Sequence, residues 1–283
     1  MKKLILFILP LASLLWLVTQ GEKLSYETAS GISFCVRNLV PKLFIFFCFS
    51  AFLAESGICD EAAVSFNGFG YEISAFVFGL LAGFPTGAVI ANHYYKNGMI
   101  TKKRGEYILT FSNNVSISFL FFYVSKFIGT KGAFCIFLCQ LFSSFAFFAV
   151  GRFFLGFEDK KSYDSFCLKA KNNLAQSFVT AIKRGTESMI SVCGIIIFFS
   201  CFCEFVPSNI FGFLELTRGI ELISSLPYGE RLFISSAFVG FCGFSVHCQT
   251  ASVCDLGMKK YMAVKIISLF VFPFFTKFIF NLL

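Results

Sequence analysis

The stretch SAFVFGLLAGFPTGAVIA at residues 74–91 decides the fold of this chain. It is almost wholly apolar, yet its centre carries the motif GFPTGA at 83–88, with two glycines and a proline. Such residues interrupt a membrane helix, and the freed backbone groups cost free energy in lipid unless they face protein or a water-filled cavity. We therefore predict a broken helix at this motif, a feature that marks the solute site in many transporters.

A second motif of the same kind, GFSVHCQ at 243–249, lies in the apolar segment 231–250. Paired breaks in two halves of a chain are a recurring plan of transporters built from inverted repeats. We predict that each half contains a span followed by a re-entrant hairpin. The first unit is span 31–54 with hairpin 73–95, and the second unit is span 187–205 with hairpin 231–250.

The composition indicates a membrane protein, because 57% of the 283 residues are hydrophobic, only 14% are charged and 44 are phenylalanine. A soluble domain of this size could not bury so much apolar surface. A helix that spans a bilayer needs about 20 mostly apolar residues. The first apolar segment is interpreted as an uncleaved helix, since no clean signal-peptide cleavage site follows it. The candidate spans are 4–19, 31–54, 73–95, 107–127, 132–155, 187–205, 231–250 and 260–282.

Basic residues cluster between the apolar segments and produce the net charge of +8. In a soluble protein this charge would suggest a nucleic-acid partner, but here the positive-inside rule explains it and we expect no nucleic acid. The clusters lie at 2–3, 96–104 and 152–184, and all three are predicted to be cytoplasmic. Segment 73–95 must then enter and leave on one side, as a hairpin. The same scheme puts Lys259 and Lys260 outside, against the rule.

We therefore expect an all-α fold, a polytopic transmembrane helix bundle with two inverted repeats, each containing a broken or re-entrant helical hairpin. The whole chain, 1–283, forms a single membrane domain. The first repeat is 31–127 and the second is 187–283. Residues 128–186 supply a connecting span and a basic cytoplasmic loop, which could contact anionic membrane lipid or a cytoplasmic partner.

The 12 cysteines mostly lie inside apolar runs, where a thiol behaves as a small polarizable hydrophobic group. A zinc or iron–sulfur site would need paired cysteines at the spacing Cys-x-x-Cys, and Cys201 with Cys203 has the wrong spacing. We expect no metal and no cofactor. The chain also lacks the short motifs of metalloproteases, serine hydrolases and P-loop enzymes, so we do not expect an enzyme.

Polar side chains within the apolar runs are the candidates for solute binding, because each is costly in lipid and needs a partner. Glycines at the first break would let backbone N–H groups approach an anion at the start of a helix. Amides and hydroxyls in the run SNNVSIS at 112–118 can bind carboxylates without a net charge. A histidine at the second break could donate to an anion or titrate near neutral pH. The predicted solute-binding residues are Gly83, Pro85, Thr86, Gly87, Ser112, Asn113, Asn114, Glu215, Gly243, Ser245, His247 and Gln249.

Each of these groups also has a structural interpretation. The turn at 83–88 could be a packing kink, and the polar run could cap a helix or join two helices. A buried histidine is often a structural donor. Glu215 with Arg218 could form an ordinary ion pair on one helix face. The residues alone leave these alternatives open.

Taken together, the motifs resemble the sporulation integral membrane proteins of the YlbJ type, within the wider nucleoside-recognition or Gate domain group. Two positions depart from that family. Val89 stands where a lysine is usual, and 113–117 reads NNVSI in place of an NTSGP-like run. The matching segments, in the right order along most of the chain, are GFPTGA at 83–88, FSN at 111–113, CG at 193–194, ELTRG at 215–219 and GFSVHCQ at 243–249.

This resemblance implies a bacterial cell-membrane protein, placed in the membrane around the developing spore, that moves dipicolinic acid toward it. Dipicolinate is a planar dianion that suits helix N-termini, amides and hydroxyls. The expected function is a carrier or gated facilitator for a small anionic solute, with dipicolinic acid as the leading candidate. A nucleoside or other small solute, and a non-transporting membrane scaffold in sporulation, are the alternatives. The need for a sporulation partner, the direction of transport and the oligomeric state leave no trace in the sequence.

Overall fold

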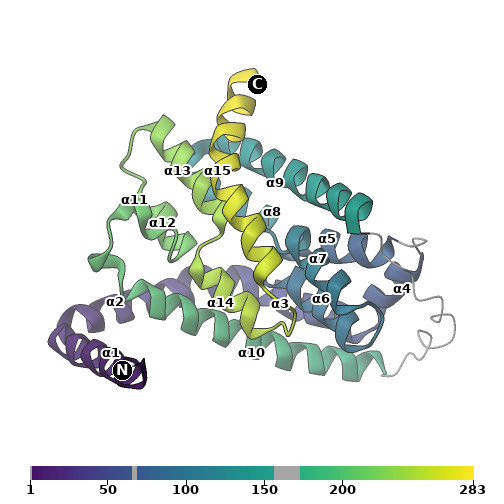
Figure 1. Ribbon diagram of the computed structural model, residues 1–283, viewed down its shortest axis with the longest axis horizontal. Coiled ribbons are helices and arrows are strands. Elements are labelled where there is room, and N and C mark those ends of the chain that lie inside the picture. The colour runs from purple at the N-terminus through teal and green to yellow at the C-terminus, as the bar shows by residue number, and fades with distance from the viewer. Residues whose placement is uncertain (1, 66–68, 156–172) are drawn as a thin grey trace.

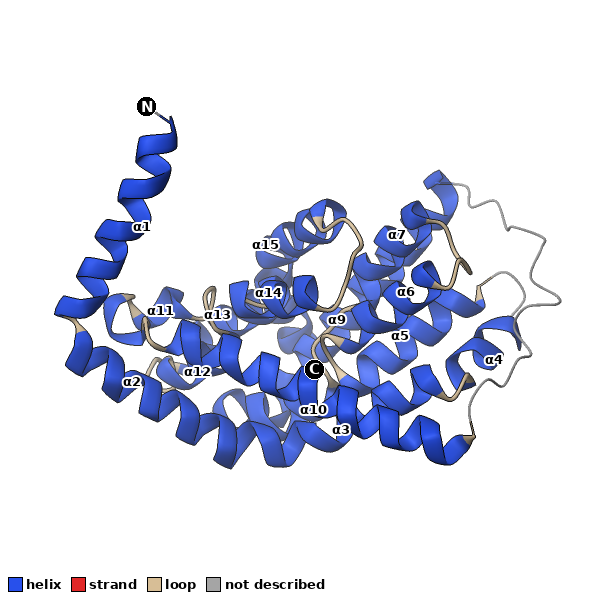
Figure 2. Ribbon diagram, turned by 90° about the horizontal axis from the view of Figure 1, so that it is seen from below, coloured by secondary structure: helices blue, strands red, loops and turns tan. Residues whose placement is uncertain are grey.

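The computed structural model describes residues 2–65, 69–155 and 173–283 and consists of helices (Figure 1). No strand occurs in these ranges, which confirms the predicted all-α class. The basic stretch 156–172, part of the predicted cytoplasmic loop, lies outside the described residues. Helix α1 (Lys2–Thr19) projects away from the other helices (Figure 2).

The remaining helices follow in two series. The first comprises α2 (Gly21–Phe34), the π-helical segment η1 (Cys35–Leu39), α3 (Val40–Glu55), α4 (Ile58–Ser65), α5 (Gly70–Ala82), α6 (Thr86–Lys96), α7 (Lys102–Ser112), α8 (Ile117–Phe119), the π-helical segment η2 (Leu120–Val124) and α9 (Ser125–Leu155). The second comprises α10 (Leu174–Ser200), the short 3-10 turn η3 (Cys203–Phe205), α11 (Ser208–Phe211), α12 (Leu216–Leu222), α13 (Tyr228–Phe241), α14 (Phe244–Ser252) and α15 (Lys259–Leu282).

Several helical segments are long and apolar enough to cross a bilayer. A bent pair, Gly21–Leu39 with Leu43–Glu55, is a further candidate span, and its two parts meet at 65°. Large apolar side chains such as Phe270 and Phe274 stay exposed, as expected of surfaces that face lipid. The lengths and the composition of these helices are consistent with an integral membrane protein. The other four candidates are Lys102–Gly151, Leu174–Phe205, Tyr228–Ser252 and Lys259–Leu282.

The longest apolar segment reverses direction at Gly129. This glycine interrupts α9 with φ 70° and ψ 164°, a conformation that side-chain-bearing residues rarely adopt. The chain folds back on itself at this point. The rings of Phe121, before Gly129, and Phe137, after it, lie 5.9 Å apart. The reversal falls between the two predicted spans 107–127 and 132–155.

The first predicted break is confirmed. Helix α5 ends at Ala82 and α6 begins at Thr86, with Gly83 between them at φ 81°. The two helices fold back on each other, since the rings of Tyr71 and Tyr94 lie 4.9 Å apart. This is the hairpin geometry expected for segment 73–95.

The second break is also present, but the hairpin predicted over 231–250 is wrong. Helices α13 and α14 are separated by Cys242 and Gly243 at φ 77° and 78°, and α14 leads away from α13 within one apolar segment, Tyr228–Ser252. The backbone groups at the break find partners elsewhere: Phe244 N–H donates to Phe213 (2.8 Å) and Ser245 N–H donates to Leu214 (2.9 Å). The structure instead has a short hairpin upstream, formed by α11 and α12.

This change reverses the side on which the last connection lies. Two ion pairs join this connection to α6 and α7. Lys96 at the end of α6 lies 2.6 Å from Asp255 in the loop between α14 and α15, and Lys260 at the start of α15 lies 3.3 Å from Glu106 in α7. The prediction that Lys259 and Lys260 lie on the face opposite the 96–104 cluster is therefore wrong. Because α13 and α14 form one crossing, Lys260 lies on the same face as the 96–104 cluster, which is the grouping of basic residues that the positive-inside rule describes.

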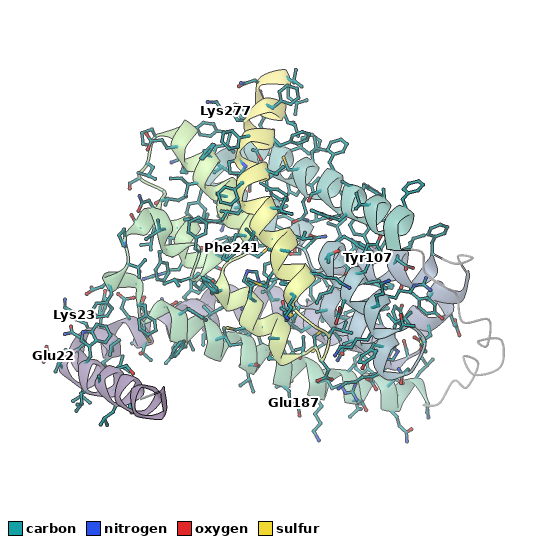
Figure 3. The ribbon with its side chains drawn as sticks, viewed as in Figure 1. Glu22, Lys23, Tyr107, Glu187, Phe241 and Lys277 are labelled. Carbon is teal, nitrogen blue, oxygen red and sulfur yellow. The ribbon has the colours of Figure 1, made fainter. Side chains whose placement is uncertain are left out.

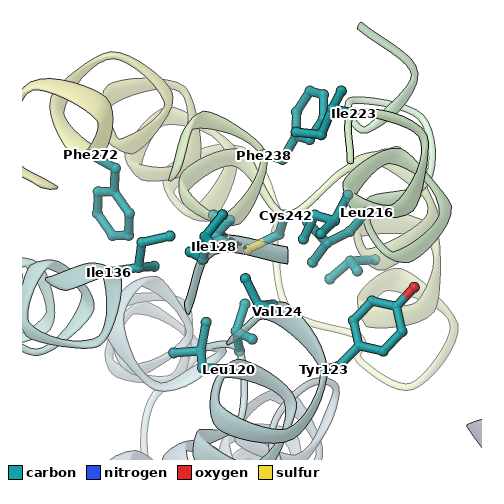
Figure 4. Packing of buried hydrophobic residues seen from close by; sticks show 14 of the residues in the cluster. Leu120, Tyr123, Val124, Ile128, Ile136, Leu216, Ile223, Phe238, Cys242 and Phe272 are labelled. Carbon is teal, nitrogen blue, oxygen red and sulfur yellow. Dashed lines mark hydrogen bonds between the residues drawn. The ribbon is translucent and has the colours of Figure 1, made fainter. Parts of the chain in front are cut away.

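Two apolar cores hold the bundle together. One joins residues from both series, including Leu120, Val124, Leu216 and Phe238 (Figure 4). The other is built mainly from α5, α6 and α7 and includes Leu256 from the loop before α15. Both cores thus include residues from the two series of helices, so neither series buries its apolar surface alone.

A buried ion pair links α5 to α7. The guanidinium of Arg104 donates to the two carboxylate oxygens of Glu72 at 2.7 and 2.8 Å, and both side chains are almost fully buried. We expect Glu72→Gln to destabilise the fold by about 3–5 kcal/mol, because it leaves a buried charge uncompensated. Thermal unfolding in detergent measures this. Glu204→Gln breaks the exposed Lys23–Glu204 pair (3.8 Å) and should change the midpoint little; equal shifts for the two variants would contradict the assignment.

Candidate functional site

Four of the helix interruptions in the described residues meet in pairs inside the bundle. In the first series, Gly83 packs against the break between α7 and α8, so that an added Cβ would lie 2.8 Å from Ser116 Cβ. In the second series, Gly243 packs against the turn between α11 and α12, where an added Cβ would lie 3.0 Å from the carbonyl oxygen of Gly212. Phe241, at the end of α13, lies near the centre of the molecule (Figure 3). Glycine is needed at both positions because the backbones touch.

A small cavity lies where these breaks converge. It encloses about 50 Å³, room for one or two water molecules. Three predicted site residues, Gly83, Glu215 and Gln249, line it together. The sequence did not single out Thr217, and it offered Ser116 only as one of a polar run. The walls are otherwise apolar, with Leu39, Leu43, Phe47, Ala82, Phe84, Val115, Phe119, Val192, Ile196, Leu216 and Val246.

Glu215 has a structural task beside the cavity. Its carboxylate caps α12 by accepting hydrogen bonds from the backbone N–H groups of Thr217 (3.0 Å) and Arg218 (2.6 Å). The proposed side-chain ion pair between Glu215 and Arg218 is not the observed arrangement, because the guanidinium of Arg218 turns toward Glu221 (3.4 Å) and Glu27 (3.7 Å). The carboxylate therefore shapes the cavity wall, with its oxygens already engaged by the backbone.

A polar cluster joins the end of α7 to α14 and α15. The amide of Asn113 donates to the hydroxyls of Thr250 (2.8 Å) and Tyr261 (3.2 Å), and Nδ1 of His247 lies 3.2 Å from the same tyrosine hydroxyl. The structure thus joins two predicted site residues, although neither lines the cavity. Tyr261 was missed by the sequence reasoning, and its only signal was a hydroxyl within the last apolar segment.

Several buried polar atoms near these breaks have no hydrogen-bond partner among the described residues. They are Ser112 Oγ, Asn113 Oδ1, Ser245 Oγ and His247 Nε2. A buried polar group without a partner costs about 1–3 kcal/mol, so each of these atoms is a place where a solute or water molecule would be bound favourably. All four belong to residues that the sequence predicted for solute binding.

The other predicted residues serve packing. The hydroxyl of Thr86 donates to Ser50 (3.2 Å), and the amide of Asn114 donates to Ser144 (3.0 Å). Gly87 lets the backbone of α7 approach, since an added Cβ would lie 2.2 Å from the carbonyl oxygen of Ser112. Pro85 occupies the residue before α6. These residues hold the breaks together and do not line the cavity.

The sequence reasoning also missed a buried lysine beside Tyr261. Lys265 of α15 is only 6% exposed, and its ammonium lies 5.6 Å from the ring centre of Tyr261. It pairs with no carboxylate among the described residues. A lysine in the middle of an apolar span is a signal that the sequence does contain, because a buried charge in a membrane segment usually has a functional reason.

Comparison with protein-family models, curated proteins and solved structures finds no match to this chain. The described residues also contain no group of three or more histidine, cysteine, aspartate or glutamate side chains placed to hold a metal ion.

The first break supplies a test of the site geometry. We expect Gly83→Ala to destabilise the protein by about 1–3 kcal/mol, because alanine disfavours φ 81° and its Cβ would meet Ser116. Gly194→Ala is the matched control: nothing lies within 4 Å of an added Cβ there, and the site is inside α10. That variant should be stabilised by about 0.5–1 kcal/mol. Thermal midpoints in detergent measure both, and the same sign for the two substitutions would refute the explanation.

Proposed function

We propose that this protein is a membrane transporter, a carrier or gated facilitator, for a small anionic solute. The observation that carries the proposal is the convergence of interrupted helices from both series on one cavity lined by Gly83, Glu215 and Gln249. Irregular backbone at membrane depth is tolerated where it lines a cavity, and binding sites of secondary transporters are built this way. The unpaired polar atoms of residues at the helix breaks give a solute something to bind.

We infer that the two series are inverted repeats, with a register different from the one expected. Each has a hairpin, then an interrupted span, then a long closing helix. From Gly83 to Asn113 and from Phe213 to Gly243 the chain runs 30 residues in both series. Gly83 thus corresponds to the turn between α11 and α12, and Asn113 corresponds to Gly243.

The packing between the series supports the same inference. Helix α15 packs on α7, and α9 packs on α13, so each closing helix contacts the interrupted span of the other series. Helices α3 and α10 lie side by side in opposite directions: Ser177 bonds to the carbonyl of Glu55 at the end of α3, and Gly185, further along α10, meets Cys48, which is earlier in α3. An exchange of this kind is expected when two units are related by a two-fold axis in the membrane plane.

The face that carries Lys96 and the 102–104 cluster is closed by polar contacts between the series. The amide of Asn92 donates to the carbonyl of Val253 (3.2 Å) and accepts from the N–H of Asp255 (3.1 Å). A hydrogen bond from Lys96 holds the pKa of the Asp255 carboxyl below its usual range. Leu256, beside these contacts, is buried. We assign this closure as the cytoplasmic gate of an alternating-access cycle.

The choice of solute rests on chemistry and on the resemblance to the YlbJ type. Neutral amides and hydroxyls together with the buried ammonium of Lys265 suit an anion that carries carboxylates. The resemblance adds dipicolinate and the membrane around the forespore. A nucleoside is the second candidate. The side-chain amide of Gln249 lines the cavity, and an amide can both donate to and accept from the edge of a base.

Uptake of labelled dipicolinate into proteoliposomes tests the function. We expect wild type to take up the label and Asn113→Leu with His247→Ala to lose at least about tenfold in rate, since the loss of two polar anchors exceeds 1.4 kcal/mol. Asn97→Leu, at an exposed position, is the control and should transport normally. Labelled uridine is assayed in parallel. Uptake of uridine alone would support the nucleoside candidate, and uptake of neither solute would count against transport of both.

The gate assignment has its own test through Cys254, a native thiol that is 9% exposed next to the contacts of Asn92. We expect Asn92→Ala with Asp255→Asn to speed labelling of Cys254 by N-ethylmaleimide about fivefold or more, because about 1 kcal/mol or more of closing contacts is lost. Mass spectrometry of the labelled peptide gives the rate. Glu204→Gln should leave it unchanged, and an unchanged rate in the double variant would remove the gate.

A further inference from the structure

A second cavity lies beside the central one and is large enough for a solute. It encloses about 480 Å³, against about 50 Å³ for the cavity at the breaks. Leu39, Leu43, Phe119 and Thr217 line both cavities, so a single layer of side chains separates them. A solute that leaves the larger space by this wall would arrive at the helix breaks.

The larger cavity lies away from the closed face. The interrupted span begins at Lys102, beside the gate, passes the break at Asn113 and reverses at Gly129. Ser118, Phe122 and Lys126 line the cavity from the part of this span that follows the break. The cavity is therefore on the side of the protein opposite the cytoplasmic gate.

Five aromatic residues line this cavity, Phe34, Phe46, Phe119, Phe122 and Tyr123. Phe119 and Tyr123 are stacked, with ring centres 5.1 Å apart and planes inclined by 26°. The hydroxyl of Tyr123 donates to the carbonyl of Thr217 (3.0 Å), which anchors its ring to the second series of helices. Phe34 lies edge-on to Tyr123 at 6.5 Å. Such a wall offers ring faces and edges to a flat aromatic molecule.

One cation lines this cavity. Lys126 is the only charged residue in its wall among the described residues, and it forms no ion pair with them. The amide of Asn38 and the hydroxyl of Ser118 also line the space, in addition to the hydroxyl-bearing residues Tyr123 and Thr217. Aromatic faces with one unpaired ammonium and neutral hydrogen-bonding groups match a planar ring that bears a carboxylate.

We propose that this cavity is an outer binding site for a planar aromatic carboxylate, with the ring against Phe119 and Tyr123 and the carboxylate on Lys126. The proposal rests on the proposed function and names the place where the solute is held before it reaches the breaks. The wall favours an aromatic ring over the acyl chain of a lipid, because the stacked pair Phe119 and Tyr123 lies in the same wall as polar side chains that an acyl chain could not bind.

The test is equilibrium binding of labelled pyridine-2,6-dicarboxylate to the purified full-length chain in detergent. We expect Lys126→Gln to raise Kd at least about tenfold, which corresponds to 1.4 kcal/mol, and Lys126→Arg to retain binding. Lys131→Gln is the matched control. Lys131 follows five residues later with its ammonium 4.4 Å from the ring centre of Phe280 and outside the cavity wall, and Kd should stay within twofold of wild type.

The outcomes separate this proposal from the proposed function. Transport by wild type together with an unchanged Kd in Lys126→Gln overturns the outer site and leaves the transporter standing. Neither binding nor transport by wild type overturns both. A phospholipid that copurifies with wild type, is lost in Lys126→Gln and is not displaced by the dicarboxylate also overturns the proposal and assigns the cavity to lipid. Displacement of such a lipid by the dicarboxylate supports the outer site.

Discussion

The fold depends on how the backbone is satisfied where its helices are interrupted. In a bilayer core no water is present to bond a free N–H or C=O group, so every break needs a partner from the protein. The break at Gly243 is bonded by the backbone of Phe213 and Leu214. The break after Asn113 is bonded by Gln140, whose side-chain amide accepts from Val115 N–H and donates to its carbonyl. The interrupted segments therefore have to meet inside the bundle.

This requirement also explains where the polar groups are. Once the breaks pack against each other, the side chains next to them are drawn into the same region, and some of their atoms remain without partners. The unpaired Nε2 of His247 and Oδ1 of Asn113 are costly in a protein that binds nothing. They are useful in a protein whose solute replaces the missing partner. The same constraint thus supports both the architecture and the proposed function.

Much of the fold could be predicted from local patterns. The apolar runs, the break at Gly83 and the reversal between 127 and 132 are set by neighbouring residues, and the structure contains them. The second hairpin could not be placed in this way. Its location depends on the hydrogen bonds from Phe244 and Ser245 to a turn about thirty residues away in the sequence. Lys265 and Tyr261 were missed because their burial depends on how α15 packs, and a periodic apolar pattern does not reveal which neighbour lies opposite.

The sequence by itself determined the class of the protein, the existence of two glycine breaks and the identity of most polar groups near them. These follow from composition and from the free energy of single residues in lipid, which do not depend on distant contacts. Only the tertiary structure decided which breaks pair, which side carries Lys260, and that Gly83, Glu215 and Gln249 share one cavity. The physical reason is that hydrogen-bond satisfaction at a break is non-local, because the partner is chosen by packing and not by position along the chain.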